Sequence, residues 1–196
     1  MEQTLSARER LIQATSHLLD IQGYHATGLN QIIKEGGAPK GSLYYYFPEG
    51  KEELVAEAIG KHGDAITEQI RGMLAESGDP AEAIYAILMF IANKFIDTDC
   101  IKAGSIASVA LETAHVSERL RDVCRRIYDA WQAAYAGILM ESGFPAARAS
   151  QIATLVTASI EGAVVMCRAH RGPEPMIAVA RELKLLIEHA QREMRR

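Results

Sequence analysis

The chain has 196 residues, enough for one or two compact domains, and its 48% hydrophobic and 23% charged residues are typical of a folded globular protein. This composition excludes a largely disordered chain, and the net charge of −4 excludes a uniformly basic nucleic-acid-binding protein. The charge is unevenly distributed, because residues 1–51 hold five basic and five acidic residues and residues 52–196 carry the whole negative excess. A cationic face for phosphate binding is therefore expected in the N-terminal segment.

Cysteine and histidine usage argues against metal and disulfide chemistry. Cys100, Cys124 and Cys167 lie far apart and form no CxxC pair, so we expect neither a disulfide framework nor a structural zinc site. Buried thiols in a reducing cytoplasm are the main interpretation, and a redox-sensing role is the alternative. The histidines show no metal-ligand spacing, and no cofactor motif is present, so no metal and no cofactor are expected. With no signal sequence and no apolar run of about 18 residues, the sequence predicts a cytoplasmic protein that does not contact a membrane.

Apolar residues recur at helical spacing along the chain and strand-like alternation is absent, which predicts an all-α fold of about nine helices. The first helix is expected from Ser6, which forms an S-x-x-E capping box with Glu9, to Ile21, with Gly23 ending it. Asp79 is expected to cap the fifth helix. The eight later helices are predicted over residues 29–35, 39–47, 51–74, 80–96, 105–113, 117–142, 146–170 and 175–193.

Residues 29–47 are predicted to form a helix-turn-helix, a unit whose second helix can enter the major groove of DNA. In that second helix Leu43 and Phe47 can pack inward, which leaves polar and tyrosine side chains for phosphates and base edges. The alternative is a short helical hairpin with its tyrosines in a core. The candidate DNA-binding residues are Thr27, Lys40, Gly41, Ser42, Tyr44, Tyr45, Tyr46 and Lys51.

The same segment resembles the TetR family of bacterial one-component repressors. The family's gapped pattern is matched by GYHAT at residues 23–27, II at 32–33, GAPKGSLYYYF at 37–47 and KEEL at 51–54. One extra residue separates Phe47 from Lys51, which is similar to the LmrA/YxaF-like branch, as is the segment 102–112. That branch tends to have Cys-Pro where this chain has Gly104 and Ser105.

The resemblance implies an N-terminal DNA-binding domain at residues 1–51, formed by three helices, and a C-terminal helical ligand-binding and dimerisation domain at residues 52–196. It implies that Lys40 and Gly41 approach bases, and that the tyrosines, Thr27 and Lys51 reach phosphates. It further implies a repressor that binds a double-stranded, palindromic DNA operator as a homodimer. A small hydrophobic inducer of undefined identity would release this repressor from the operator.

Two sets of residues in the C-terminal part are candidates for ligand binding and dimerisation. Aromatic and methionine side chains at helical spacing can line a pocket, although such residues also form ordinary cores. The candidate ligand-binding residues are Phe90, Asn93, Phe95, Glu112, Tyr128, Trp131, Tyr135 and Met166. An inward-facing Glu112 or Glu161 would favour a cationic or hydrogen-bonding ligand. The last two helices are expected to pair with a second copy through Ile152, Val156, Ile160, Val164, Leu183 and Ile187.

Two other classes of function compete with a regulator. A helical module that senses a molecule but no longer binds DNA would lack the exposed face of Lys40 and Tyr45. A helical enzyme would need converging catalytic groups. Glu112 and His115 have the spacing of an acid/base pair, but a solvated helix end explains them better, and the chain is not expected to be an enzyme.

Overall fold

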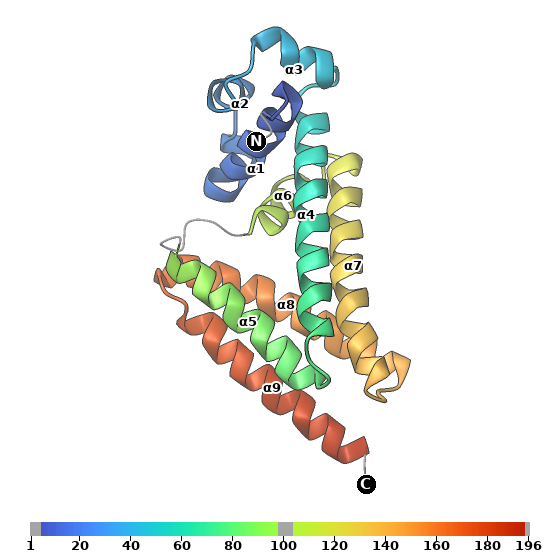
Figure 1. Ribbon diagram of the computed structural model, residues 1–196. Helices are drawn as coiled ribbons and strands as arrows, with labels where there is room; N and C mark the ends of the chain where they lie inside the picture. Colours follow the sequence, from blue (N-terminus) through green and yellow to red (C-terminus); the bar gives the residue numbers. More distant parts are fainter. Residues whose placement is uncertain (1–4, 98–103, 195–196) are drawn as a thin grey trace. The chain divides into compact units, whose positions relative to one another are not determined.

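The computed structural model describes residues 5–97 and 104–194, and within these ranges the chain is all-α with nine helices. The helices are α1 (Ala7–Ala26), α2 (Leu29–Glu35), α3 (Lys40–Tyr46), α4 (Lys51–Ala75), α5 (Pro80–Asp97), α6 (Ser105–Thr113), α7 (Glu118–Glu141), α8 (Ala146–His170) and α9 (Glu174–Met194) (Figure 1). The predicted fold class is confirmed for this part of the chain, and the predicted bounds differ from these mainly at helix ends. Of the three cysteines, Cys124 and Cys167 are buried, and Cys100 lies outside the described residues.

Local signals explain where α1 begins and where it is interrupted. Ser6 Oγ accepts the Glu9 backbone N–H at 3.2 Å, and the Glu9 carboxylate accepts the Ser6 backbone N–H at 2.8 Å, so the predicted capping box is formed. Gly23 has a φ of 76°, which breaks the helical conformation before the last residues of α1. A side chain is strongly disfavoured at this φ, so the glycine determines the turn that leads to α2.

The chain divides into two compact units, of which the first comprises Met1–Asp64 and Gly104–Arg126. It contains α1, α2, α3 and α6, together with the N-terminal parts of α4 and α7. α1 packs against α2, α3 and α6 (Figure 1). The core of the three N-terminal helices and the start of α4 includes Leu11, Leu18, Ile32, Leu43, Phe47, Leu54 and Ala58. Burial of this apolar surface fixes the orientation of α3 within the unit.

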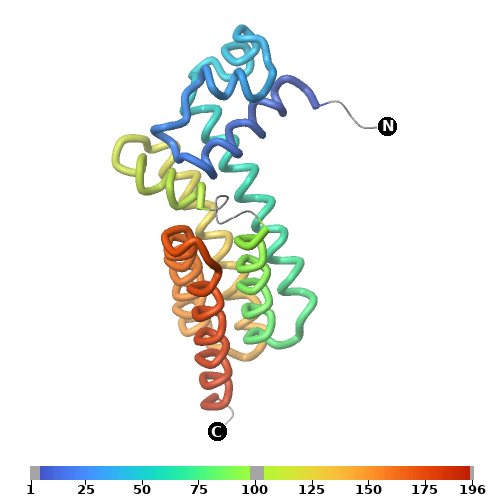
Figure 2. Tube along the Cα trace, turned by 90° about the vertical axis from the view of Figure 1, so that its left-hand side faces the viewer, coloured from blue at the N-terminus to red at the C-terminus, as the bar shows by residue number. Residues whose placement is uncertain are grey.

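The second unit comprises Ala65–Ala103 and Ile127–Arg196. α9 packs along α5 and against α8, so the three helices lie alongside one another (Figure 2). Their buried faces are apolar, as the predicted helical spacing required, and include Ile84, Leu88, Phe95, Ile152, Val156, Leu183 and Ile187. α4 and α7 each contribute residues to both units.

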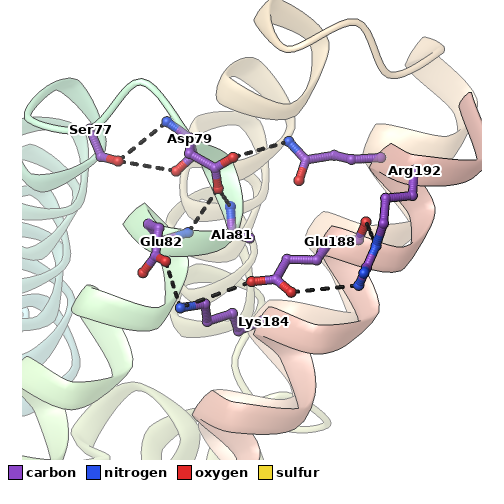
Figure 3. Close-up of polar contacts among 8 residues, drawn as sticks. Ser77, Asp79, Ala81, Glu82, Lys184, Glu188 and Arg192 are labelled. Carbon is purple, nitrogen blue, oxygen red and sulfur yellow. Dashed lines mark hydrogen bonds and ion pairs between the residues drawn. The ribbon is translucent and has the colours of Figure 1, made fainter. Parts of the chain in front are cut away.

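Polar contacts join the start of α5 to α9 (Figure 3). Asp79 Oδ1 accepts the backbone N–H groups of Ala81 at 2.9 Å and Glu82 at 3.1 Å, so Asp79 caps α5 as expected. Its other oxygen accepts a long hydrogen bond from Gln191 Nε2 at 3.4 Å. Lys184 Nζ lies 2.5 Å from Glu82 Oε1, which adds an exposed ion pair between the two helices.

α8 is long and apolar enough to cross a membrane by length and composition, with an 18-residue stretch of mean hydropathy 1.5. A single helix of this kind is weak evidence for a membrane span. Core helices of globular proteins have the same properties, and α8 buries Ile152, Val156 and Ile160 within the second unit.

Removal of the α5 cap should lower stability by a defined amount. Asp79→Ala leaves two backbone N–H groups without their acceptor, so we expect a loss of about 1 kcal/mol in the free energy of unfolding. The melting temperature should fall by about 2–4 °C in a chain of this size. Glu76→Ala, at an exposed position just before the turn, is the matched control and should change neither quantity. Equal stability of the two variants in denaturant titrations would show that the cap contributes nothing.

Candidate DNA-binding unit

α3 presents one polar, aromatic face to solvent and one apolar face to the core. Leu43 and Phe47 are fully buried, as predicted. On the opposite face Lys40 is exposed, and Tyr44 and Tyr45 are 51% and 79% exposed. Large aromatic side chains are seldom left this exposed without a partner surface, and their hydroxyls can donate to phosphates.

The other DNA-binding candidates on α3 are Ser42, Tyr46 and Gly41. Ser42 and Tyr46 are half-buried, and Tyr46 packs against the core with its ring 5.0 Å from that of Tyr45 in an edge-to-face arrangement. No atom lies within 4 Å of the position that a Cβ would take at Gly41. The backbone of α3 is therefore open to close approach at Gly41, beside Lys40.

Most cations of the N-terminal segment are engaged within the chain. Arg8 pairs with Glu57 at 2.5 Å, and Arg10 donates to the carbonyl oxygens of Gly36 and Gly37 in the turn before α3. Lys34 and Lys40 are exposed by contrast. Lys34 was not among the predicted contacts, although its place in the last turn of α2, off the apolar face, is the signal that could have identified it.

Two of the predicted phosphate contacts have partners within the chain, which corrects the prediction for the buried Thr27 and leaves that for the half-buried Lys51 a prediction. Thr27 is fully buried, and its hydroxyl donates to the Gly23 carbonyl oxygen at 2.6 Å, so it has no exposed donor. The Lys51 ammonium donates to the Tyr24 carbonyl oxygen at 2.6 Å and lies 4.1 Å from the centre of the Tyr24 ring. Both residues act inside the unit, where they hold the turn between α1 and α2.

Glu112 of α6 binds the same turn from its other side. Its carboxylate accepts the backbone N–H of Tyr24 at 3.1 Å and that of His25 at 2.7 Å, and Ser108 Oγ donates to it at 2.7 Å. A Cβ at Gly23 would lie closer to Glu112 Oε1 than van der Waals contact allows. Gly23 thus permits both the turn and the approach of α6. The prediction that Glu112 lines a ligand pocket is corrected, because its oxygens are occupied by α1.

The charges around this turn are coupled. Desolvation raises the pKa of Glu112, but hydrogen bonds from the His25 N–H, the Ser108 hydroxyl and the Tyr24 N–H outweigh it, and the net pKa lies below its ordinary value. Desolvation lowers the pKa of Lys51, and the negative charge of Glu112 opposes this shift. The hydrogen bonds in the folded unit therefore stabilise the ionised form of Glu112.

Two family models match this chain. Residues 11–58 match the model for bacterial regulatory proteins of the tetR family, and residues 80–182 match the C-terminal domain of the LmrA/YxaF-like transcriptional regulators. The chain belongs to the TetR family. It is a DNA-binding transcriptional regulator and not an enzyme. The first match covers α2 and α3, the predicted helix-turn-helix, and the second includes α6 with Glu112.

Relatives of known sequence agree over nearly the whole chain. The HTH-type transcriptional regulator YxaF of Bacillus subtilis (strain 168) is 42% identical over 92% of this chain and 95% of its own. The regulator LmrA of the same organism is 38% identical over 89% of this chain and 93% of its own.

Solved structures of TetR regulators share the fold. A TetR regulator from Legionella pneumophila superposes with a TM-score of 0.84 at 17% identity, covering 94% of this chain and 98% of its own. Reduced Escherichia coli NemR gives a TM-score of 0.79 at 21% identity, covering 91% and 96%. These similarities establish the architecture alone.

The predicted ligand-binding residues of this TetR regulator are only partly brought together. Trp131 and Tyr135 on α7 and Phe95 on α5 are buried in the second unit. Phe90 on α5 and Tyr128 on α7 are half-buried. Asn93 is exposed and Met166 is 50% exposed, so the expectation that these two face the interior is corrected. The apolar spacing of α5 and α8 did not distinguish their inner and outer sides.

The predicted dimer residues form the interior of the second unit. Ile152, Val156, Ile160, Val164, Leu183 and Ile187 are between 0% and 9% exposed in the single chain. They cannot also form a surface that meets a second copy, so this residue assignment is corrected. The apolar residues that α8 leaves exposed are Leu155, Val165 and Met166, at 43%, 57% and 50%.

Glu112→Gln should weaken the unit in a pH-dependent manner. The amide keeps the shape but loses the charge that the two N–H groups bind, so we expect the free energy of unfolding to fall by about 1–2 kcal/mol near neutral pH. Because the pKa of Glu112 is lowered on folding, this contribution is present above the ordinary carboxyl pKa and is lost as the pH falls through the folded value. The difference between variant and wild type should therefore shrink below about pH 4.

Denaturant titrations across this pH range measure the effect. The control is Glu118→Gln, at the start of α7, where the side chain is 88% exposed and makes only a loose ion pair with Arg121. A Glu112→Gln difference that stays constant from neutral to acidic pH would contradict a role for the charge.

Proposed function

We propose that this TetR regulator is a cytoplasmic repressor that binds a near-palindromic operator as a homodimer and leaves it when a small hydrophobic molecule binds the C-terminal domain. Residues 1–51 contact DNA in this proposal, and residues 52–196 bind the ligand and the second copy. α6, in the latter part, also holds the helices α2 and α3 in place. The observation that carries the proposal is the exposed face of Lys40, Tyr44 and Tyr45 on α3.

The α3 face has the chemistry and size that the major groove accepts. The groove is wide enough for one helix, and lysine can donate to guanine edges or to phosphates. Gly41 allows close approach of the backbone, Tyr44 lies one turn after Lys40 on the same side of the helix, and Tyr45 follows Tyr44. Lys34 at the end of α2 adds a second exposed cation for the DNA backbone. Leu43 and Phe47 hold this face rigidly, so little order has to be gained on binding.

The uncovered side of α8 supports the homodimer. Leu155, Val165 and Met166 are exposed and are separated by the small exposed residues Ala158 and Gly162, which together make an apolar stripe along the helix. An exposed apolar stripe on a helix is typical of a contact surface, and a second copy can cover the side that the single chain leaves open. Two-fold symmetry presents two α3 helices, which requires two half-sites of opposite orientation.

Release by a ligand is supported by two of the similar proteins and by the second unit. NemR is named a transcriptional repressor, and Bacillus subtilis FadR, which has the same fold with a TM-score of 0.68, is described in complex with stearoyl-CoA. Buried aromatic residues of α7 supply apolar contacts for a hydrophobic molecule. A ligand releases DNA only if it binds more tightly to the conformation that fits the operator poorly.

Lys40→Ala and Tyr45→Ala should each reduce operator affinity at least about tenfold, because each removes a donor from the recognition face. The chain's own upstream region is the DNA to use in mobility-shift assays at several salt concentrations. Lys40→Ala should also reduce the slope of affinity against salt concentration by about one counterion, if its contact is to a phosphate.

The matched control is Arg181→Ala, which removes an exposed cation from α9 in the other compact unit. It should bind the operator as the wild type does. If both α3 variants bind as tightly as this control, the recognition helix is misassigned.

Val165→Glu should convert the dimer to a monomer. A charge in the apolar stripe of α8 would have to be buried without a partner, which is costly in an interface. Sedimentation velocity should give a dimer for the wild type and a monomer for the variant, with operator affinity lost as well. Val116→Glu, at a position 70% exposed in the first unit, should remain dimeric. A wild-type chain that sediments as a stable monomer at micromolar concentration would rule out the dimer.

A further inference from the structure

One face of α7 gathers three aromatic residues in the second unit. Tyr128, Trp131 and Tyr135 follow one another at intervals of three and four residues, so they lie on the same side of the helix. Trp131 and Tyr135 are 7% and 1% exposed. The rings of Tyr128 and Trp131 meet edge to face, with 5.5 Å between their centres. In an edge-to-face pair, the ring that presents its edge does not have its faces covered by its partner, so these faces can contact other groups.

A carboxyl group from α8 lies at this aromatic cluster. Glu161 accepts a hydrogen bond from Tyr128, and it is near enough to Tyr135 for its charge, after burial, to raise the pKa of that phenol. Burial raises the pKa of Glu161 itself to about 7, although the Tyr128 hydrogen bond acts to lower it. Among the ion pairs of residues 5–97 and 104–194, Glu161 has no lysine, arginine or histidine partner.

Trp131 adds a second unmatched group. Its indole Nε1–H is buried and has no acceptor among the described residues. A buried donor without an acceptor and a buried carboxyl group without a cationic partner are both costly, and such groups mark candidate binding sites. A carboxylate beside aromatic side chains can attract a cation in two ways, through its charge and through the ring faces. The cluster differs from an ordinary surface ion pair, in which water solvates both charges.

We propose that Glu161, Tyr128, Trp131 and Tyr135 form the ligand site of this regulator and that the site selects an aromatic organic cation. The ammonium group of the ligand pairs with the Glu161 carboxylate, and its apolar ring packs against the aromatic side chains of α7. An acceptor atom elsewhere on the ligand satisfies the Trp131 N–H. This inference rests on the proposed release by a ligand and names the class of molecule that acts.

α7 connects the site to the DNA-binding unit along one continuous helix. The aromatic cluster belongs to the second unit, whereas Ser117 and Arg119 at the start of the helix belong to the first. There the Ser117 hydroxyl donates to Glu52 at 2.7 Å, and Arg119 forms an ion pair with Glu49. Glu52 lies in the first turn of α4 and Glu49 just before it, directly after the recognition helix. A shift or rotation of α7 on ligand binding therefore acts on residues that follow α3.

The chain contains a single tryptophan, so tryptophan emission, excited selectively over the seven tyrosines, comes from this site alone. Three probes share one apolar ring and differ in charge: para-tert-butylbenzylammonium, para-tert-butylbenzyl alcohol and para-tert-butylbenzoate. Titrated into the full chain without DNA, the ammonium probe should change Trp131 emission at the lowest concentration, and the benzoate should bind weakest. Equal binding of the alcohol and the ammonium, or tighter binding of the benzoate, would overturn the proposal.

Variants separate the charge from the packing. Glu161→Gln should lose at least about tenfold in affinity for the ammonium probe while keeping its affinity for the alcohol. Tyr128→Phe keeps the ring and should retain the preference for the ammonium over the alcohol. Glu182→Gln, an exposed carboxylate of α9, is the control and should titrate as the wild type. Unchanged ammonium affinity in Glu161→Gln would overturn the assignment.

The fluorescence titration and the operator assay test different claims. A wild-type chain that fails to bind any operator contradicts the proposed function, and the probe titration still decides whether the site binds a cation. A chain that binds its operator but shows no charge preference at Trp131 contradicts this inference alone.

Discussion

The interaction on which the DNA-binding unit depends is the bond between the Glu112 carboxylate and the backbone N–H groups of Tyr24 and His25. Gly23 interrupts α1 directly before these two residues, so their N–H groups lose the regular helical pattern at the point where the chain turns toward α2. Lys51 binds the Tyr24 carbonyl oxygen from the start of α4. One turn thereby joins α1, α4 and α6, and its position determines where α2 and α3 begin.

This turn also explains why the residue range of the C-terminal family match differs from the residue ranges of the compact units. The match to the C-terminal domain model covers residues 80–182, yet α6 belongs to the same compact unit as the DNA-binding helices. Hydrogen bonds from backbone N–H groups to a carboxylate are short and stronger than those between neutral groups. A displacement of α6 would therefore change the geometry of the turn, because Glu112 is bonded to it.

Short-range signals allowed most of the fold to be predicted from the sequence. Ser6 with Glu9, Gly23 and Asp79 act on residues a few positions away, so helix ends could be located from local chemistry. The apolar spacing of α8 correctly identified Ile152 and its neighbours as one face. Spacing alone does not tell which neighbour covers a face, and here the same chain covers it, whereas Leu155 is exposed. The partners of Thr27 and Glu112 could not be predicted because they depend on tertiary packing rather than on neighbouring residues.

Amide hydrogen exchange at Tyr24 and His25 tests the central claim most directly. If Glu112 holds the turn, these two amides exchange slowly in the wild type and at least about tenfold faster in Glu112→Gln, while amides within α3 keep their protection. The same variant should then bind the operator more weakly, even though Glu112 binds the protein backbone and is not proposed to contact DNA. Unchanged exchange at Tyr24 and His25 in the variant would contradict the account, because the turn would then be held without α6.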